Sequence, residues 1–255
     1  MTNHNKRIEV LHDLGVLDSG PERVYDDLTK LTADICEVPI CLISLVEENR
    51  QWFKSEVGLG ICETKIEQSI CAHAIAQDDY LEIPDTHLDD RTIVNTLCQG
   101  DKPIRYYAGA LLRTVDGWPL GTLCVLDYRP RRLKELQKRA LKVHANSVTR
   151  QLELTRVLLQ NAVSVWENPD LAAPSQADTD LIEKTHKLFE TLTSRESEIM
   201  GLIVGRSGNL SSKQIARELN ISHRTVDFHR ANILSKMAAG SIAELIALSI
   251  RARLF

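Results

Sequence analysis

The chain has 255 residues, enough for two domains, and 43% apolar with 26% charged residues is an ordinary composition for a globular protein. It has no run of about eighteen apolar residues, and its start, MTNHNKRIEVLHDL, lacks the apolar part of a secretory signal. These features exclude a membrane-spanning or secreted protein, so we expect a cytoplasmic one without a membrane partner. The net charge is −4, but residues 186–255 carry ten Lys and Arg against six Asp and Glu, so only this part suits polyanionic DNA.

The six cysteines all lie in the first half, at positions 36, 41, 62, 71, 98 and 124. Their apolar neighbours, as in PICLIS, SICAH and GTLCV, predict reduced thiols in a cytosolic core. No CxxC pair is present, so we expect no metal site. GxSxG, HExxH and Walker A strings are also absent, so we predict no catalytic residues and no enzyme.

Two amphipathic helices open the chain. Residues 5–17 form the first expected helix, Asp18-Ser19-Gly20-Pro21 breaks it, and the second runs to about Glu37. Pro39 ends that pattern, and the apolar, β-rich residues 39–46 predict a buried central strand.

Short strands and one short helix follow. We expect further strands at residues 50–57, 81–83, 104–114 and 120–126. A short helix is expected at 68–77, and Asp116-Gly117 predicts a hairpin between the last two strands. Helices followed by strands with short helical crossings predict an α+β layer with a central antiparallel sheet.

Several strings in this first part resemble a GAF domain. They are RQWFKS at 50–55, ET at 63–64, SICAHAI at 69–75, DR at 90–91, IRYYAG at 104–109 and GTLCVLD at 121–127. The resemblance covers residues 5–155. It implies a PAS-related fold, with an antiparallel sheet backed by helices and a small-molecule pocket on the other face. No cofactor is named by the resemblance, and the ligand of such a pocket stays unidentified.

The candidate ligand-binding residues come mainly from strand ends and loops, where pockets form. They are Trp52, Phe53, Ser69, Cys71, His73, Asp85, Asp90, Arg91, Tyr106, Tyr107 and Cys124. The pair Cys71-x-His73 also suggests a metal or a thiol switch, but residues two apart on a helix diverge by about 200°, which favours a buried Cys and a separate His. Asp90 and Arg91 could instead form a structural ion pair.

One long helical pattern connects the two parts. Residues 133–166 contain no Pro or Gly, and Leu136, Ala140, Val143, Ser147, Gln151 and Leu154 follow one another at three-and-four spacing, with the polar Ser147 and Gln151 interrupting an otherwise apolar seam. A helix of this length exceeds what one small domain needs, which suggests pairing with a partner helix. Packing along the domain's own sheet is the alternative for its first half. Residues 167–185, with two prolines and small or acidic side chains, are expected to be a flexible linker.

Three short helices are expected between Thr193 and Met237. Thr193 with Glu196, and Ser211 with Gln214, are capping boxes. Ser222 is a plausible N-cap for the third helix, and Asn220 tolerates the left-handed conformation that a tight turn needs. A last helix from Ser241 has a broad apolar surface, which suits burial in its own domain and against a second copy.

The third helix can be placed by angle at 100° per residue. Val226, Ile233 and Met237 then form a narrow apolar stripe, and the opposite face holds polar, small and basic residues. His229 and Arg230 fall nearer the core side, so we expect structural roles for them.

The strings LTSRE at 192–196, KQIARELNIS at 213–222, RTVDFHRAN at 224–232 and KM at 236–237 resemble the LuxR/FixJ-type helix-turn-helix. The turn at 205–209 is about three residues longer than usual for that family. The resemblance implies an all-α DNA-binding domain at 186–255, with the third helix in a DNA groove. Candidate DNA-binding residues are Lys213, Arg224, Thr225, Asp227, Phe228, Asn232 and Lys236.

Together these features predict a multidomain transcription regulator. Its GAF-like part would sense a small molecule or a redox signal and control promoter binding by a homodimer on double-stranded DNA, with RNA polymerase as a further partner. Two alternatives stay open: the GAF-like part could be a thiol enzyme similar to methionine sulfoxide reductase, or a ligand-free dimerisation module.

Overall fold

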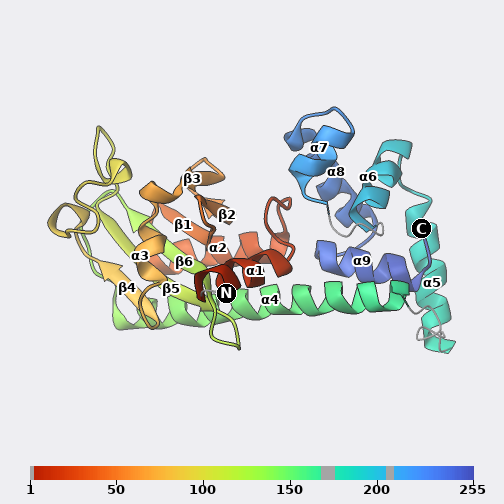
Figure 1. Cartoon of the computed structure of the whole chain (residues 1–255), viewed down its shortest axis with the longest axis horizontal. Helices are drawn as coiled ribbons and strands as arrows, with labels where there is room; N and C mark the ends of the chain where they lie inside the picture. The colour runs from red at the N-terminus through yellow and green to blue at the C-terminus, as the bar shows by residue number, and fades with distance from the viewer. Residues whose placement is uncertain (1–2, 168–175, 205–209) are drawn as a thin grey trace. The chain divides into compact units, whose positions relative to one another are not determined.

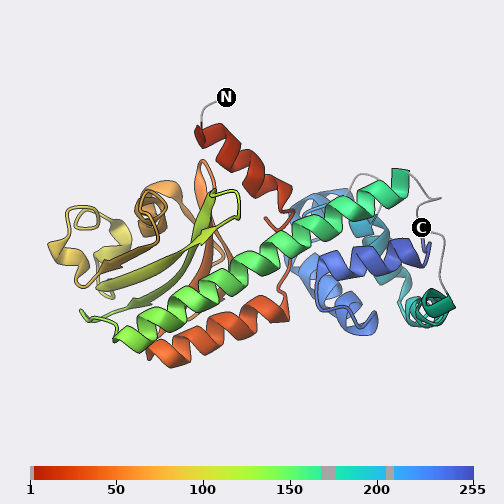
Figure 2. The same cartoon turned by 90° about the horizontal axis from the view of Figure 1, so that it is seen from below.

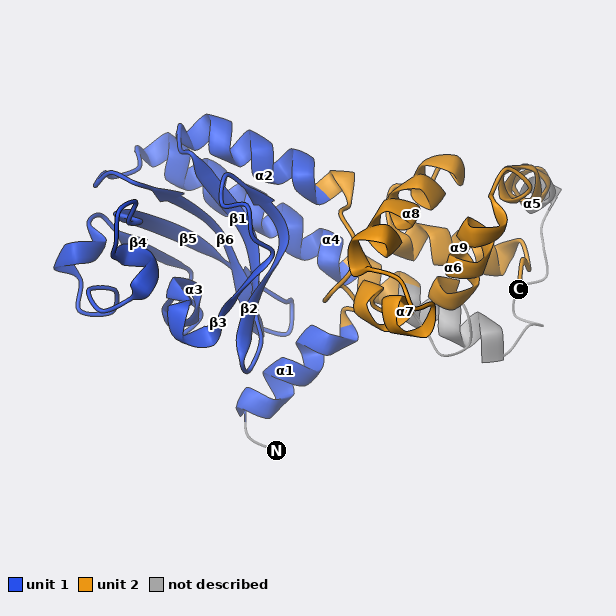
Figure 3. Ribbon diagram, turned by 90° about the horizontal axis from the view of Figure 1, so that it is seen from above, with its two compact units in different colours: residues 1–13, 25–153 blue, residues 14–24, 154–255 orange. Residues whose placement is uncertain are grey.

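The computed structural model describes residues 3–167, 176–204 and 210–255 (Figure 1). The chain forms two compact units, which Figure 3 distinguishes by colour. The first comprises Met1–Asp13 with Tyr25–Glu153, and the second comprises Leu14–Val24 with Leu154–Phe255.

The first unit is built on one antiparallel sheet, whose described strands are β1 (Ile40–Val46), β2 (Arg50–Val57), β3 (Glu63–Lys65), β4 (Tyr80–Ile83), β5 (Tyr106–Arg113) and β6 (Pro119–Asp127). The strand order is β3-β2-β1-β6-β5-β4. The central strands β1 and β6 pair along Leu42 with Cys124 and Ser44 with Thr122. Because nearly every residue of β1, β5 and β6 is buried, these strands form the centre of the domain.

Helices cover both faces of this sheet. Figure 2 shows α2 (Arg23–Cys36) and α4 (Glu135–Glu167) along one face, and α3 (Ile70–Ala74) on the other. The predicted antiparallel α+β architecture is therefore confirmed. The hairpin at Asp116-Gly117 is confirmed too, because β5 pairs with β6 and Gly117 has the positive φ of 88° that such a turn needs.

Some boundaries differ from the sequence-based expectation. Helix α1 (Asn3–Asp13) ends four residues earlier than expected, because Gly15 adopts a left-handed φ of 63° that stops the helix. Helix α3 is shorter than expected at both ends, and Ser69 caps it by accepting a hydrogen bond from the amide of Ala72. Strand β3 was not predicted, since three residues are too few to show an alternating pattern.

The long helix α4 was predicted with nearly its observed bounds. Its described buried apolar residues are Leu141, Ala145, Val148 and Leu152, which form its inner stripe. The seam predicted from three-and-four spacing lies on the outer side instead: Leu136 is 65% exposed and Val143 54% exposed. Packing along the sheet therefore uses a different stripe from the one expected, and the predicted seam stays available to solvent.

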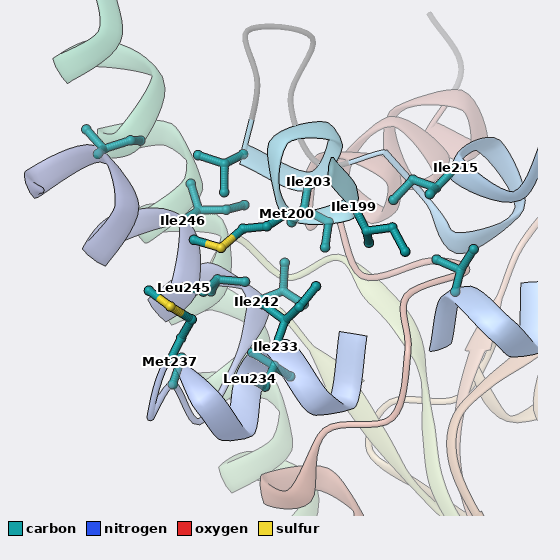
Figure 4. Close-up of a cluster of buried hydrophobic side chains, with 14 of the residues drawn as sticks. Ile199, Met200, Ile203, Ile215, Ile233, Leu234, Met237, Ile242, Leu245 and Ile246 are labelled. Carbon is teal, nitrogen blue, oxygen red and sulfur yellow. The ribbon is translucent and has the colours of Figure 1, made fainter. Parts of the chain in front are cut away.

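The second unit contains α5 (Gln176–Phe189), α6 (Ser194–Val204), α7 (Ser212–Glu218), α8 (His223–Lys236) and α9 (Ile242–Arg251). These helices enclose an apolar core whose labelled members Figure 4 shows pointing toward one another. The core includes Ile199, Ile215, Ile233 and Leu245, each fully buried. Burying one such side chain contributes about 1.5–3 kcal/mol, so this small domain has a substantial core of its own.

The predicted helix starts are confirmed. Both capping boxes form: Thr193 exchanges hydrogen bonds with Glu196, and Ser211 with Gln214. Ser222 caps α8, and Asn220 has the left-handed φ of 52°. Helix α9 buries most of its apolar surface inside its own unit, with Leu248 partly buried against the same core.

Part of the expected linker is helical, because α5 begins at Gln176. The remainder of its Pro-rich part, and the long turn at 205–209, lie outside the described residues. Among the described helices, none has a stretch of 18 residues with the hydropathy and low charge needed to cross a bilayer.

Candidate functional site

Helix α8 is held in place by its ends and by its inner face. The Ser222 hydroxyl accepts a hydrogen bond from the amide of Thr225 at 3.1 Å, which starts the helix. Val226, Ile233 and Met237 are all at most 1% exposed, so the predicted apolar stripe is confirmed. The packing of this stripe determines which side chains α8 presents to solvent.

The outer face of α8 is available to a partner. Arg224, Phe228, Ala231 and Ser235 are all exposed, as the angular placement predicted. Phe228 has 63% of its surface exposed, so most of its ring is accessible to a binding partner. An exposed guanidinium and an exposed ring one turn apart match the polar and apolar features of base edges in a major groove.

Arg230 lies on the same helix but has a different environment. It is 1% exposed, and its guanidinium donates to the Ser212 hydroxyl at 2.9 Å and to the Leu210 carbonyl at 2.8 Å. Burial lowers the pKa of Arg230 to about 10, which still leaves it charged at neutral pH. Its two hydrogen bonds tie α8 to the start of α7 and thereby help set the angle between the two helices.

Two of the predicted DNA-binding lysines make ion pairs within the second unit. Nζ of Lys213 lies 3.1 Å from Oδ1 of Asp18. Nζ of Lys236 lies 2.7 Å from Oε2 of Glu196 and 3.3 Å from the Thr191 carbonyl oxygen. Each ammonium is therefore partly neutralised, and a phosphate would have to compete with a carboxylate for it.

The remaining candidates on α8 differ in accessibility. Thr225 is exposed, and its hydroxyl lies 2.8 Å from that of Ser222. Asn232 and Asp227 are half-buried, and Oδ1 of Asp227 has no hydrogen-bond partner among the described residues. The ring of His229 is half-buried and lies edge-on to Phe228, with 5.8 Å between centroids.

Four of the predicted ligand-binding residues meet in the core between the sheet and α3. Phe53, Cys71, Tyr107 and Cys124 belong to one cluster of buried side chains there. They come from β2, α3, β5 and β6, and the alternation of side chains along each strand brings them to the same face. Trp52 and Tyr106 precede two of them directly, so their side chains point to the opposite face; the Tyr106 hydroxyl donates to Glu82 there at 2.9 Å.

Cys71 is surrounded by hydrogen-bond donors. Its sulfur lies 3.1 Å from the Thr122 hydroxyl, 3.4 Å from the Tyr107 hydroxyl and 3.7 Å from Sγ of Cys124. Burial raises the pKa of the Cys71 thiol, but hydrogen bonds from Cys124, Thr122 and Tyr107 outweigh burial and lower that pKa. Burial and the bond to Cys71 raise the pKa of Cys124, so its proton is retained.

Sequence reasoning missed two members of this group, Thr122 and Ser44. Thr122 is two residues from Cys124 on β6 and pairs with Ser44 on β1, so both hydroxyls lie on the same face as the thiols. The spacing Thr-x-Cys on an apolar strand is the signal that could have revealed Thr122. Nothing local identifies Ser44, because its role depends on strand pairing.

The other predicted residues do not join this cluster. Ser69 is used as the cap of α3, and its hydroxyl donates to Gln51. Asp85 pairs with Arg105 at 2.8 Å, and this hydrogen bond lowers the pKa of Asp85. His73 is exposed while Cys71 is buried, so the predicted divergence of the two is confirmed.

The proposed ion pair between Asp90 and Arg91 is wrong. Arg91 pairs with Asp89 through Nε–Oδ1 and Nη2–Oδ2 contacts of 2.8 and 2.6 Å. Asp89 also accepts from the Arg91 backbone amide, so the turn itself places this carboxylate beside the guanidinium. Asp90 is exposed. Among the described residues, no group of three or more His, Cys, Asp or Glu side chains is arranged to hold a metal ion.

Comparison with known families assigns both domains. Residues 20–152 match the GAF domain family, which covers more than half of the chain. The chain belongs to the GAF domain family. Residues 190–249 match the bacterial regulatory proteins of the luxR family, so the GAF domain is followed by a LuxR-type helix-turn-helix domain.

Three curated relatives are each similar to a part of this chain. A cyclic di-GMP phosphodiesterase of Pseudomonas aeruginosa is 38% identical over 129 residues, which are 51% of the chain and 22% of that protein. The transcriptional regulatory protein FixJ of Bradyrhizobium diazoefficiens is 49% identical over 63 residues, 24% of the chain and 29% of FixJ. The probable transcriptional regulatory protein SgaR of Hyphomicrobium methylovorum is 32% identical over 126 residues, 49% of the chain and 56% of SgaR.

The chain spans less than two thirds of the length of each of these relatives. The similarity to FixJ, with 49% identity, falls on a stretch as long as one helix-turn-helix domain.

Proposed function

We propose that this protein is a transcription regulator that binds double-stranded promoter DNA through α8, under the control of its GAF domain. The observation that carries this proposal is the outer face of α8, where Arg224 and Phe228 are exposed on a capped helix whose opposite face is buried. The similarity to the regulators FixJ and SgaR supports it.

The chemistry of the exposed side chains suggests separate roles in the groove. Arg224 would donate two hydrogen bonds to a guanine, and Phe228 would contact a thymine methyl group. Asp227 would accept from a cytosine or disfavour wrong sequences by repulsion. Thr225 and Asn232, beside them, would bind phosphate or base edges.

Lys213 and Lys236 would contribute to DNA binding only after leaving their carboxylate partners. Lys213 and Lys236 would contact phosphates once they exchange Asp18 and Glu196 for DNA. Since both ion pairs are within about 3 Å, we expect these lysines to add less affinity than exposed ones would.

We further propose that the protein acts as a homodimer on a two-fold operator. Leu136, Val143, Leu154 and Val157 are about half exposed or more, although they lie on a helix with a separate buried stripe. Leu136, Val143 and Val157 are separated by multiples of seven residues, the spacing of a coiled-coil seam. Pairing of two such stripes would set the distance between two copies of α8 and hence the spacing of half-sites.

The GAF domain would supply the signal, and RNA polymerase would be the partner that responds at the promoter. A small molecule bound near the α3 face of the sheet, or a chemical change there, would shift the population of helix arrangements. The residues that would respond are those of the cluster around Phe53, Cys71, Tyr107 and Cys124.

The test starts with the full chain and a pool of random-sequence duplex DNA, from which bound duplexes are selected and sequenced. We expect a two-fold motif to emerge, and Arg224→Ala to lower affinity for it by at least about tenfold while binding to unrelated DNA changes little. No enriched motif, or equal binding by Arg224→Ala, would refute DNA reading by α8. Affinities are compared at one fixed salt concentration, because phosphate contacts depend strongly on salt.

A further inference from the structure

Two thiols face each other in the core of the GAF domain. Cys71 lies on α3 and Cys124 on β6, 53 residues apart in the sequence, and their sulfurs are 3.7 Å apart. Both side chains are buried, at 2% and 0% exposure. All six cysteines of the chain are free thiols in this structure, so the pair is reduced.

The surroundings of Cys71 are more polar than packing alone requires. Hydroxyl groups of Thr122 and Tyr107 lie within hydrogen-bond distance of its sulfur, and those two hydroxyls are 3.4 Å from each other. The Ser44 hydroxyl is buried beside the same sulfur and also interacts with it. Hydrogen bonds donated to a sulfur stabilise its thiolate form, so three hydroxyls gathered around one sulfur favour a charged thiolate there.

Glycine at position 109 makes room for this arrangement. A Cβ atom on Gly109 would lie 2.3 Å from the Tyr107 hydroxyl, on the strand next to Cys124. Any larger residue would push the phenol away from the sulfur. Gly109 on β5 thus leaves space for the Tyr107 hydroxyl, one of the hydrogen-bond donors to the Cys71 sulfur.

We propose that Cys71 and Cys124 form a reversible dithiol–disulfide site in the core of the GAF domain, with a hydroperoxide as the oxidant. The Cys71 thiolate attacks the outer oxygen of the hydroperoxide, an S–O bond forms, the O–O bond breaks, and the leaving alkoxide or hydroxide takes up a proton. The Cys124 sulfur then attacks the sulfenic acid, and the S–S bond forms as hydroxide leaves with the Cys124 proton as water. Two thiols lose two electrons, which reduce the hydroperoxide to an alcohol or water. An external dithiol reverses the reaction by thiol–disulfide exchange.

The disulfide requires the two sulfurs to move closer together. A disulfide bond is about 2.05 Å long, so the two sulfurs must approach by about 1.7 Å from their present separation. Because β6 is central in the sheet and α3 is only five residues long, we expect the Cys71 side chain and α3 to adjust rather than β6. The movement changes the face on which the GAF domain would bind a ligand, so oxidation would act as the signal; this last link rests on the proposed function.

The experiment uses the reduced full-length protein, treated with increasing hydrogen peroxide and then denatured for thiol counting and peptide mapping. We expect the number of free thiols to fall from six to four, with a cross-linked peptide pair containing Cys71 and Cys124 and recovery of six thiols after addition of dithiothreitol. Persistence of both thiols at peroxide concentrations that oxidise the exposed Cys62, or a cross-link of Cys71 to another cysteine, would overturn the proposal.

Variants sharpen the result without being needed for it. Cys62→Ser should leave the cross-link intact, whereas in Cys124→Ala the Cys71 sulfenic acid should accumulate and be trapped by dimedone. Tyr107→Phe removes one hydrogen-bond donor to the Cys71 sulfur, so a larger fraction of Cys71 is protonated near neutral pH and oxidation should be several-fold slower there. At alkaline pH the thiol loses its proton in both proteins, so the difference in rate should be smaller. Equal rates for Tyr107→Phe and wild type at both pH values would argue that the hydroxyl cluster only fills space.

Binding of the selected duplex is finally compared between the reduced and the peroxide-treated protein. A change in affinity that dithiothreitol reverses, and that Cys124→Ala lacks, links the site to DNA. If the disulfide forms and affinity is unchanged, the redox site stands and its role as the signal is refuted. If no duplex can be selected at all, the proposed function fails, while the peptide map still decides the redox site.

Discussion

Nζ of Lys236, in the last turn of α8, lies 2.7 Å from Oε2 of Glu196, in the first turn of α6. The carboxylate also accepts hydrogen bonds from the amide and hydroxyl of Thr193. Glu196 therefore serves both as part of a capping box and as the partner of a recognition-helix lysine. One buried carboxylate thus connects the first and third helices of the DNA-binding domain.

This carboxylate should make the C-terminal domain sensitive to acid. The hydrogen bond from Lys236 holds the pKa of Glu196 at about 2, below its usual value of about 4.5. A depressed pKa stabilises the folded state fully above about pH 4.5, and this stabilisation is lost as the pH falls toward 2. Thermal unfolding followed by circular dichroism should show this loss in the wild type and a smaller one in Glu196→Gln.

At neutral pH, Glu196→Gln should already be less stable by about 1–3 kcal/mol, because it weakens a charged hydrogen-bond network. Glu198→Gln is the matched control, since Glu198 makes an exposed ion pair with Arg195 and its substitution should cost less than about 1 kcal/mol. Equal effects of the two substitutions would contradict the assigned role of Glu196.

Substitutions of Arg224 and Arg230, six residues apart on α8, should separate an effect on DNA binding from an effect on folding stability. Arg224→Ala removes an exposed side chain, so urea unfolding should change by less than about 0.5 kcal/mol while DNA affinity falls. Arg230→Ala leaves the Leu210 carbonyl and the Ser212 hydroxyl without their donor, and should cost about 2–4 kcal/mol. Arg230→Lys keeps the charge but not the fork of donors, so it should recover only part of this loss. A stable Arg230→Ala protein would contradict the anchoring role.

Gly121 should be intolerant of any side chain. A Cβ atom there would lie 1.9 Å from the Ser44 carbonyl oxygen, a backbone atom of the neighbouring strand that cannot turn aside. Gly121→Ala should therefore destabilise the GAF domain by more than about 3 kcal/mol or prevent its folding, measured by denaturant unfolding or soluble yield. Gly60→Ala is the control: it has open space and only a positive φ of 75°, so its cost should be about 1–2 kcal/mol.

The exposed stripe of α4 should decide the oligomeric state. Val143→Glu places a charge in the middle of the proposed seam and should shift the protein from dimer to monomer in sedimentation experiments, with little change in circular dichroism. Val143→Ile keeps the seam apolar and should preserve the dimer. A dimer that survives Val143→Glu would exclude this stripe as the interface.

Local features of the chain were predictable because they depend on near neighbours. The caps at Thr193, Ser211 and Ser222 bond to amides or side chains three residues away, so their spacing alone identifies them. The angle of 100° per residue likewise placed Val226 inside and Arg224 outside, since a regular helix leaves no other choice. The GAF and LuxR-type strings identified both domains for the same reason: their motifs are local.

Local sequence features could not predict which side chains meet across the sheet. Cys71 and Cys124 come together only because β6 is central and α3 crosses above it, and Ser44 joins them through strand pairing. The preference of Arg91 for Asp89 over Asp90 depended on the shape of one turn. The exposed side of α4 was assigned only when the sheet selected Leu141 and Val148 for burial. The sequence by itself therefore determined the two domains, their helix starts and the outer face of α8. Tertiary structure alone decided the thiol pair, the ion-paired lysines and the free stripe of α4, because contacts between distant residues depend on how elements pack.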